Sequence, residues 1–309
     1  MNTSSPLFQI RQSLILLMTA VIWGATFVAQ SLGMDAVGPF TFTTARMVLG
    51  SLFLFPIVVF LRARLGANRP AEAARRRTPE YRRNLIIGGA LCALCLFGGE
   101  SLQQFGFVHD TEVGKSGFIT ALYIVFVPLI NLMLGQRNRP LIWLAVVLAV
   151  GGLWHLCIPP EGFTVATGDI YVLACAIVFS LHILVIGRFV TKVDGIELSM
   201  MQFALGSLLA GSAMLLCETP TWEGVSAAFP AMLWAGVMSN GIAYTMQMVG
   251  QRGMNDTTAS LILSLESVCS VLAGWLILGE VLSAREGFGC VLMACAVVLA
   301  QLPGKRKRA

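Results

Sequence analysis

The segment ESLQQFGFVHDTEVGKSGFITALYIVFVPLINLMLG at residues 100–135 matches YTMQMVGQRGMNDTTASLILSLESVCSVLAGWLILG at residues 244–279 without a gap. The offset of 144 residues sets Gln103 against Gln247. A second match, at an offset of 156 residues, repeats the run Leu-Gly-Ser-Leu at 49–52 and 205–208. The chain therefore contains two copies of one sequence repeat, and such internal repeats in membrane proteins are typical of transporters.

The composition of the 309 residues places the chain in lipid. Hydrophobic residues make up 56% and charged residues 12% of the chain, and the mean hydropathy is +0.78. A soluble domain of this length would have too little polar surface to cover itself. Windows of about 19 residues instead predict ten membrane-spanning helices. These helices cover roughly residues 13–33, 39–61, 85–107, 114–134, 141–158, 170–187, 197–217, 229–250, 257–278 and 286–303.

Lysine and arginine predict the orientation of these helices. The two termini and the loops after the even-numbered helices carry 18 of the 21 basic residues. Both termini are therefore expected in the cytoplasm, with the chain as a multi-pass protein of the cell membrane. Each repeat holds five helices, an odd number, so the second repeat (159–309) is expected to enter the membrane from the side opposite to the first (1–158). The expected fold is all-α, with ten transmembrane helices in two inverted five-helix repeats.

The basic loop from Arg62 to Arg83 also invites an interpretation as a site for anionic lipid or nucleic acid. It contains one aromatic residue, Tyr81, and the orientation of the chain is sufficient to explain such a run of arginines. We expect a small-molecule substrate and the lipid bilayer as partners, and no nucleic acid.

Polar side chains at membrane depth are the candidates for a binding site, because such residues are costly in lipid. Several of them recur at helical spacing and form stripes that point away from lipid. The candidate substrate-binding residues are Trp23, Arg46, Glu100, Gln103, Tyr123, Asn240, Tyr244, Gln247, Glu266 and Ser267. The alternative for the uncharged members is structural, because Ser, Asn and Gln can join neighbouring helices by hydrogen bonds of about 0.6 to 2 kcal/mol.

Two glutamates within the predicted helices are the candidate proton-coupling residues. Glu266 lies near the middle of the ninth helix, and Glu100 lies in the outer half of the third. A buried carboxylate must be paired, protonated or hydrated, so the alternative for each is a structural ion pair. The alignment sets Glu100 against Tyr244 and Glu266 against Leu122. The acids therefore occupy non-equivalent positions, which suits one asymmetric site between the repeats.

Four further polar residues have interpretations of their own. Arg46 can counter Glu100 or a substrate carboxylate, or it can extend toward the membrane surface, and both alternatives remain. His182 is interpreted as a hydrogen-bonded core residue rather than a proton relay. Asp169 and Asp256 are expected to cap the starts of helices.

Small residues line one face of the fifth helix at Ala145, Ala149 and Gly152, and one face of the tenth at Ala296 and Ala300. Small side chains let helices in a membrane approach closely. These faces are expected either to pack against a helix of the same chain or to support a homodimer.

These features together resemble the drug/metabolite transporter superfamily, EamA branch. The resemblance covers essentially the whole chain and rests on the two inverted copies, Trp23-Gly24 with Phe27, the Leu-Gly-Ser-Leu runs, Leu265-Glu266 and the ending Leu278-Gly279-Glu280. Members of that family often have Glu-Pro in the ninth helix, whereas this chain has Glu266-Ser267, so the resemblance does not predict a proline kink here. It implies a secondary transporter or exporter of small metabolites, commonly amino acids, with a central cavity.

The expected function is therefore secondary transport or export of a small polar metabolite by alternating access, with protons as the expected coupling ion. An amino acid is favoured, because the acids suit an amine and Arg46 suits a carboxylate. The alternative is uncoupled uniport of a cationic or other small metabolite. An intramembrane enzyme would need a nucleophile and base or a metal cluster, which three scattered histidines do not supply. We expect no enzymatic activity, no cofactor and no bound metal.

Overall fold

The computed structural model describes residues 6–136, 138–159, 162, 165–278 and 283–302, and every regular element in them is a helix. In chain order the elements are α1 (Pro6–Met34), α2 (Pro39–Asn68), α3 (Pro70–Arg76), α4 (Pro79–Val108), α5 (Val113–Ala121), α6 (Tyr123–Met133), α7 (Pro140–Cys157), α8 (Thr167–Phe189), α9 (Gly195–Cys217), α10 (Trp222–Leu233), the π-helical segment η1 (Trp234–Tyr244), α11 (Thr245–Gln251), α12 (Asp256–Leu263), α13 (Glu266–Leu278) and α14 (Ala284–Gln301). The predicted helix stop at Gly279-Glu280 and the basic residues Lys305 to Arg308 lie outside the described residues.

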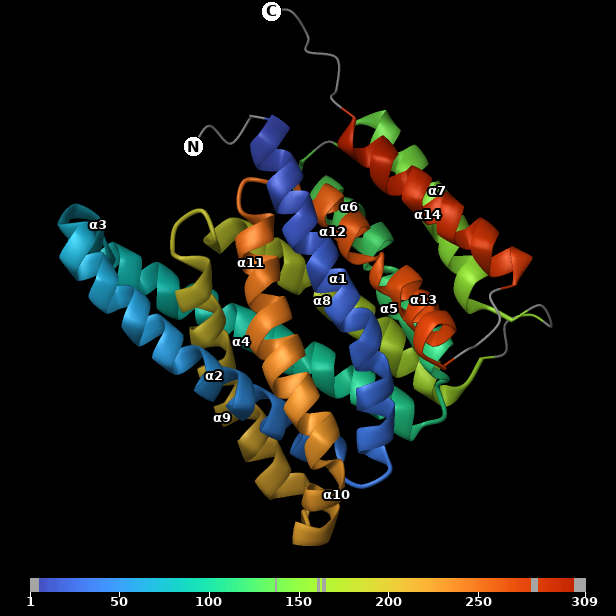
Figure 1. Ribbon diagram of the computed structural model, residues 1–309, viewed down its shortest axis with the longest axis horizontal. Helices are drawn as coiled ribbons and strands as arrows, with labels where there is room; N and C mark the ends of the chain where they lie inside the picture. Colours follow the sequence, from blue (N-terminus) through green and yellow to red (C-terminus); the bar gives the residue numbers. More distant parts are fainter. Residues whose placement is uncertain (1–5, 137, 160–161, 163–164, 279–282, 303–309) are drawn as a thin grey trace, which may run out of the picture.

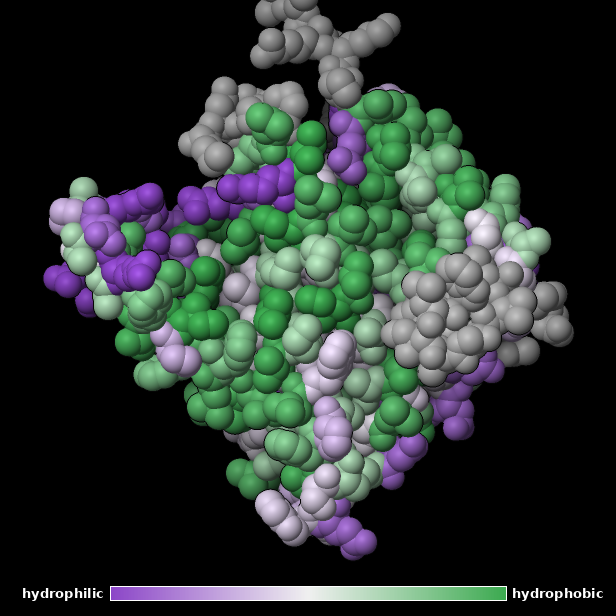
Figure 2. Space-filling model, viewed as in Figure 1, coloured by the Kyte–Doolittle hydropathy of each residue, from purple (hydrophilic) through white to green (hydrophobic). Residues whose placement is uncertain are grey.

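The helices form a tilted bundle in which α1 begins and α14 ends on the same side (Figure 1). We call this side the terminal face, and the side on which α1 ends and α4 connects to α5 the opposite face. Apolar side chains cover most of the surface visible in Figure 2, while charged side chains gather around α3. Within the described residues, nine helical stretches are long and apolar enough to cross a membrane. The molecule therefore has the all-helical membrane fold that its composition predicts.

The ninth predicted span is not one of these nine stretches, and the structure divides it into α12 and α13. The break is a tight turn at Ser264 and Leu265, in which the Leu265 and Ser267 amides donate to carbonyls three residues earlier. Such bonds belong to a 3₁₀ turn. A similar break at Leu122 divides α5 from α6, and the 144-residue offset sets this residue against Glu266. Corresponding helices of the two halves are thus interrupted at corresponding depths, and neither break has a proline at the turn itself.

The helices that end the two repeats, α7 and α14, pack against each other within the chain. A Cβ atom at Gly152 would collide with the backbone of Gly289 and Met293, and one at Gly289 would collide with the Gly152 carbonyl. Ala149 and Ala296 are fully buried. The structure therefore bears out the first of the two alternatives for these small-residue faces, packing within one chain.

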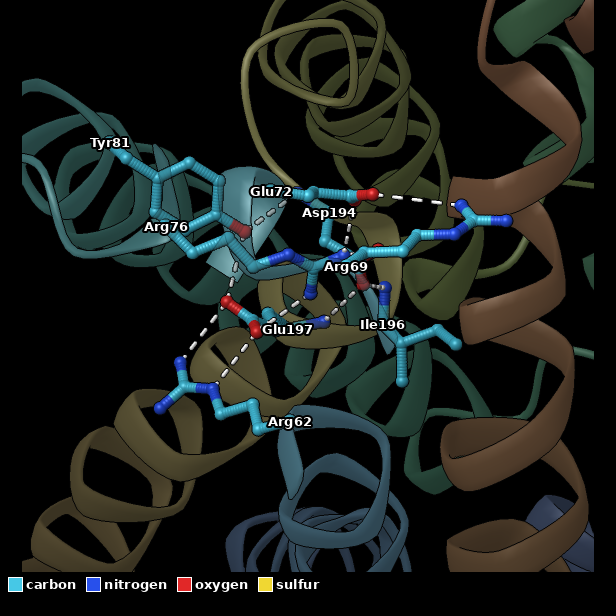
Figure 3. Close-up of polar contacts among 8 residues, drawn as sticks. All are labelled: Arg62, Arg69, Glu72, Arg76, Tyr81, Asp194, Ile196 and Glu197. Carbon is cyan, nitrogen blue, oxygen red and sulfur yellow. Dashed lines mark hydrogen bonds and ion pairs between the residues drawn. The ribbon is translucent and has the colours of Figure 1, made fainter. Parts of the chain in front are cut away.

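A cluster of ion pairs joins the two halves at the terminal face (Figure 3). Glu197, at the start of α9, contacts Arg62 of α2 and Arg76 of α3 at 2.9 Å each, and it accepts a hydrogen bond from the Tyr81 hydroxyl at 2.9 Å. Arg76 also contacts Glu72 at 3.0 Å, and this hydrogen bond holds the pKa of the Glu72 carboxyl below its usual range. The first turn of α9 is therefore fixed to three elements of the first half.

The other ends of α2 and α9 are joined as well. Glu218, just after α9, accepts hydrogen bonds from the backbone amides of Phe40 and Thr41 at 2.8 Å each. These amides belong to the first turn of α2, where helical N–H groups lack intrahelical partners. The helices α2 and α9 are therefore bound to each other at both faces.

Two predicted helix caps have different outcomes. The carboxylate of Asp169 accepts a hydrogen bond from the Ala166 amide at 2.8 Å and so caps α8 as predicted. The prediction for Asp256 was wrong, because the preceding residue, Asn255, accepts the hydrogen bonds from the first turn of α12. An asparagine next to an aspartate offers two capping side chains, and the sequence pattern alone favoured the charged one.

Candidate functional site

A small cavity lies in the middle of the bundle, lined by helices from both halves. Its lining residues are Trp23, Thr26, Phe27, Gln30, Arg46, Gln103, Thr120, Tyr123, Phe179, His182, Ile183, Ser239, Tyr244, Gln247 and Glu266. The space open to the centres of water molecules is about 40 Å³. One water needs roughly 10–15 Å³ by this measure, so the cavity accommodates a few waters rather than a metabolite. The site is contracted in this conformation, and a substrate requires movement of the surrounding helices.

The two helix breaks meet at one hydrogen bond in the cavity wall. Tyr123 is the first residue of α6 and Glu266 is the first residue of α13, and the Tyr123 hydroxyl donates to Glu266 Oε1 at 3.0 Å. Across the part of the chain that the structure describes, no basic side chain forms an ion pair with Glu266. Its carboxylate is 4% exposed. Such an acid is a binding point for a cation or a proton, since a buried carboxylate without either is strongly disfavoured.

The second acid, Glu100, is in a different setting. Its Oε1 lies 3.2 Å from Nη2 of Arg46, and the two side chains are 0% and 2% exposed. Arg46 also donates from Nε to Asn240 at 3.1 Å, from Nη1 to Gln30 at 2.8 Å and from Nη2 to Ser239 at 3.1 Å. Arg46 therefore does not extend toward the membrane surface, and its charge is balanced by Glu100. The pair adds no net charge to the cavity, which leaves Glu266 as its uncompensated acid.

Aromatic rings and two unpaired polar atoms complete the cavity wall. The rings of Trp23 and Tyr244 lie 4.6 Å apart, and His182 packs edge-on against Tyr244 at 5.8 Å. His182 is hydrogen-bonded to Gln202 at 3.0 Å, as expected for a core histidine. Trp23 Nε1 and Gln247 Oε1 are buried without a hydrogen-bond partner. Because buried polar groups are normally paired, this donor and this acceptor are available for a ligand.

Seven of the ten predicted binding residues line this cavity: Trp23, Arg46, Gln103, Tyr123, Tyr244, Gln247 and Glu266. The other three are not among the lining residues. Glu100 and Asn240 both contact the lining residue Arg46. Ser267 donates to the carbonyl of Gly117 at 3.3 Å and joins α13 to α5.

Eight lining residues were not among the ten predicted binding residues: Thr26, Phe27, Gln30, Thr120, Phe179, His182, Ile183 and Ser239. Thr26 and Phe179 lie three residues from Trp23 and His182, a spacing that could have revealed them. Ser239 could not be found this way, because it lies in the π-helical segment η1. Helical turns of that kind are wider than those of an α-helix, so the α-helical period selected its neighbour Asn240 instead.

Comparison with known proteins gives the same assignment for the whole chain. The EamA-like transporter family matches it twice, at residues 11–157 and 166–302. An uncharacterized transporter of Archaeoglobus fulgidus is 28% identical over 293 residues, which cover 93% of this chain and 84% of that protein. The threonine/homoserine exporter RhtA of Escherichia coli strain K12 is 25% identical over 300 residues, which cover 94% of this chain and 89% of that protein.

A crystal structure of another protein shares the fold. It superposes with a TM-score of 0.73 at 20% sequence identity, covering 97% of this chain and 99% of that one. The names of the relatives are those of transporters and not of enzymes. A family match over both halves, together with an all-helical membrane fold around a polar cavity, leads to one conclusion: the chain belongs to the EamA-like transporter family.

Proposed function

We propose that this protein is a secondary transporter that exports a small polar metabolite, an amino acid or a related compound, across the cell membrane. The observation that carries the proposal is Glu266, a buried acid without a basic partner among the described residues, in a cavity lined by both halves. The relationship to exporters of threonine and homoserine supports an amino acid as substrate. The abundance of basic residues at the terminal face supports a cytoplasmic location for that face.

Glu266 would exchange a proton for the amine of the substrate. With one hydrogen bond from Tyr123, the ionised carboxylate is incompletely stabilised in the membrane interior, so it takes up either a proton or a positively charged ligand. Binding of one excludes the other. Opening of the cavity to each side in turn then couples proton entry to substrate exit. The helix breaks at Leu122 and at Ser264 lie beside this residue and allow the half-helices to move.

A second candidate function is uncoupled transport of a cationic metabolite. Arg46 favours it, because its guanidinium already contacts Glu100 and three neutral side chains. A substrate carboxylate would have to compete with these partners. The cavity then presents one negative charge and aromatic rings, a combination that suits an organic cation.

Counterflow in proteoliposomes separates the two functions. Vesicles are loaded with an unlabelled amino acid or with the amine that its decarboxylation would give. Entry of the same compound in labelled form is then measured, and the rates for the amino acid and for its amine are compared. The proposal predicts exchange of amino acids and little exchange of the amines. Preference for the amines would support the second candidate. Failure of amino acids, amines and nucleosides alike to exchange would contradict both.

A further inference from the structure

The two halves of the chain contain equivalent junctions at opposite faces of the membrane. At the opposite face, the loop between α4 and α5 meets the first turn of α8. At the terminal face, the loop between α11 and α12 meets the first part of α1. The offsets of 144 and 156 residues relate these junctions, since they set His109 against Gly253 and Gly168 against Gln12. The junctions can therefore be compared residue by residue.

The junction at the opposite face is closely packed and holds an ion pair. Lys115 Nζ lies 3.2 Å from Asp169 Oδ2, and the two side chains are 7% and 5% exposed. Thr111 donates to the other carboxylate oxygen at 3.1 Å, and the Gly168 amide donates to the His109 carbonyl at 3.1 Å. A Cβ atom at Gly168 would collide with Thr111 and with two backbone carbonyls. The loop is thus held against α8 by charge and by direct backbone contact.

At the equivalent junction of the terminal face, the two positions that match the ion pair hold uncharged residues. Ser13 and Ala259 occupy the positions that correspond to Asp169 and Lys115. The contact is instead made by Gln12, whose side-chain amide donates to the carbonyls of Val249 and Arg252 at 2.7 and 2.9 Å. Neutral hydrogen bonds of this kind are weaker than charge-assisted ones.

A hollow of about 470 Å³ adjoins the terminal-face junction, against about 40 Å³ for the central cavity. Ser13, Met254, Asn255 and Thr258 are among its lining residues. Its walls come from the start of α1 and from the loop and first turn of α12, the elements that form the junction, together with Arg139 and the end of α14. The hollow thus adjoins the junction whose contact is neutral.

We propose that the Lys115–Asp169 ion pair is the gate of the opposite face, and that the hollow at the terminal face is the vestibule from which substrate approaches the central cavity. The inference rests on the proposed function, because a gate has a role only in a protein that opens to both sides. Opening toward the opposite face requires separation of α5 from α8, which breaks this pair. Opening toward the terminal face separates α1 from the loop between α11 and α12, where the matching positions are uncharged, and the ion pairs of Glu197 on that face do not line the hollow. The conformation open to the terminal face is therefore the favoured one in the absence of substrate.

The test measures access to the cavity and needs no substrate. Ser239→Cys places a thiol in the cavity lining with little change in size. Membrane vesicles of known orientation are treated with a membrane-impermeant thiol reagent from one side, and mass spectrometry measures modification of residue 239 alone. We expect faster modification from the terminal face. Equal or faster modification from the opposite face would overturn the proposal.

Neutral variants then test the ion pair itself. Lys115→Gln and Asp169→Asn, each added to Ser239→Cys, are expected to raise the rate from the opposite face about tenfold, because each removes the ionic attraction that holds α5 against α8 in the closed state. The double variant Lys115→Gln/Asp169→Asn removes both charges of the pair, so it tests the gate even where a single variant fails to fold. Glu112→Gln, an exposed acid of the same loop, is the matched control and is expected to leave the rate unchanged.

A double variant that is modified as slowly as the parent from the opposite face would overturn the gate. Because modification requires neither substrate nor proton gradient, the gate and the proposed function fail separately. Loss of the gate effect with transport intact refutes only the ion pair. Normal gating without transport of any compound refutes the function.

Discussion

Neutralising Glu100 is expected to destabilise the protein far more than neutralising Glu266. Glu100→Gln leaves the Arg46 guanidinium buried at 2% exposure, without the carboxylate that now lies 3.2 Å from it. Removing one partner of a buried ion pair costs about 3–5 kcal/mol. For a chain of this size, such a loss corresponds to a fall in Tm of roughly 5–15 °C. Thermal unfolding of the purified protein in detergent measures the difference.

Two variants make this measurement specific to the ion pair. Glu100→Gln/Arg46→Gln removes both charges and is expected to recover most of the lost stability, since the residue that matches Arg46 in the second half is Gln202. Glu266→Gln is the matched control, because that acid has no basic partner in the described part of the chain. A Tm for Glu100→Gln equal to that of the parent, or no recovery in the double variant, would refute the assignment of Glu100 to a structural pair.

Three further predictions concern the ends of the helices. Glu197→Gln weakens two arginine contacts at the terminal face and is expected to lower Tm by several degrees. An unchanged Tm would contradict a structural role for Glu197. Glu218→Gln weakens the hydrogen bonds to the first turn of α2 and is expected to cost about 1 kcal/mol. Thermal unfolding tests this beside Thr41→Ala, which removes only the hydroxyl that donates to Glu218 at 2.6 Å, and an unchanged Tm for Glu218→Gln would contradict the prediction. The hydrogen bond from Arg76 lowers the pKa of Glu72, so its contribution to stability is present above the unfolded-state pKa and is lost as pH falls through the folded-state pKa. The acid-induced decrease in Tm should therefore be smaller in Glu72→Gln than in the parent, and identical profiles would contradict this contribution.

The sequence predicts the fold well, because the constraints of the bilayer act on composition alone. Long apolar runs, the distribution of arginine and the repeated segment are enough to predict inverted repeats around a polar centre. Many of the cavity-lining residues can also be predicted, because polar side chains at membrane depth stand out in an apolar sequence. Gln103 and Gln247 have equivalent positions and both line the cavity, as does Glu266.

Departures from a regular α-helix account for the residues that the sequence misplaced. Ser267 lies three residues after Ser264, so a continuous helix would place both on one face. The turn at Ser264 and Leu265 ends that period, and Ser267 donates to the Gly117 carbonyl instead. In the π-helical segment η1 the α-helical period also fails: it predicts Asn240 in the cavity lining, whereas the structure has Ser239 there. The partner of Arg46 depends on a choice between side-chain conformations, which a helical pattern does not encode.

The central claim is that Glu266 couples substrate to protons. It is tested most directly by efflux of labelled threonine from proteoliposomes with and without a pH gradient, comparing the parent with Glu266→Gln and with the exposed control Glu112→Gln. Replacing a charge-assisted hydrogen bond by a neutral one costs about 1–1.5 kcal/mol, which predicts a rise in KM of roughly 5- to 10-fold for Glu266→Gln. The account also predicts that this variant loses the acceleration by the pH gradient, while the control retains it. A Glu266→Gln protein that transports threonine with the KM and the pH-gradient response of the parent would contradict the account.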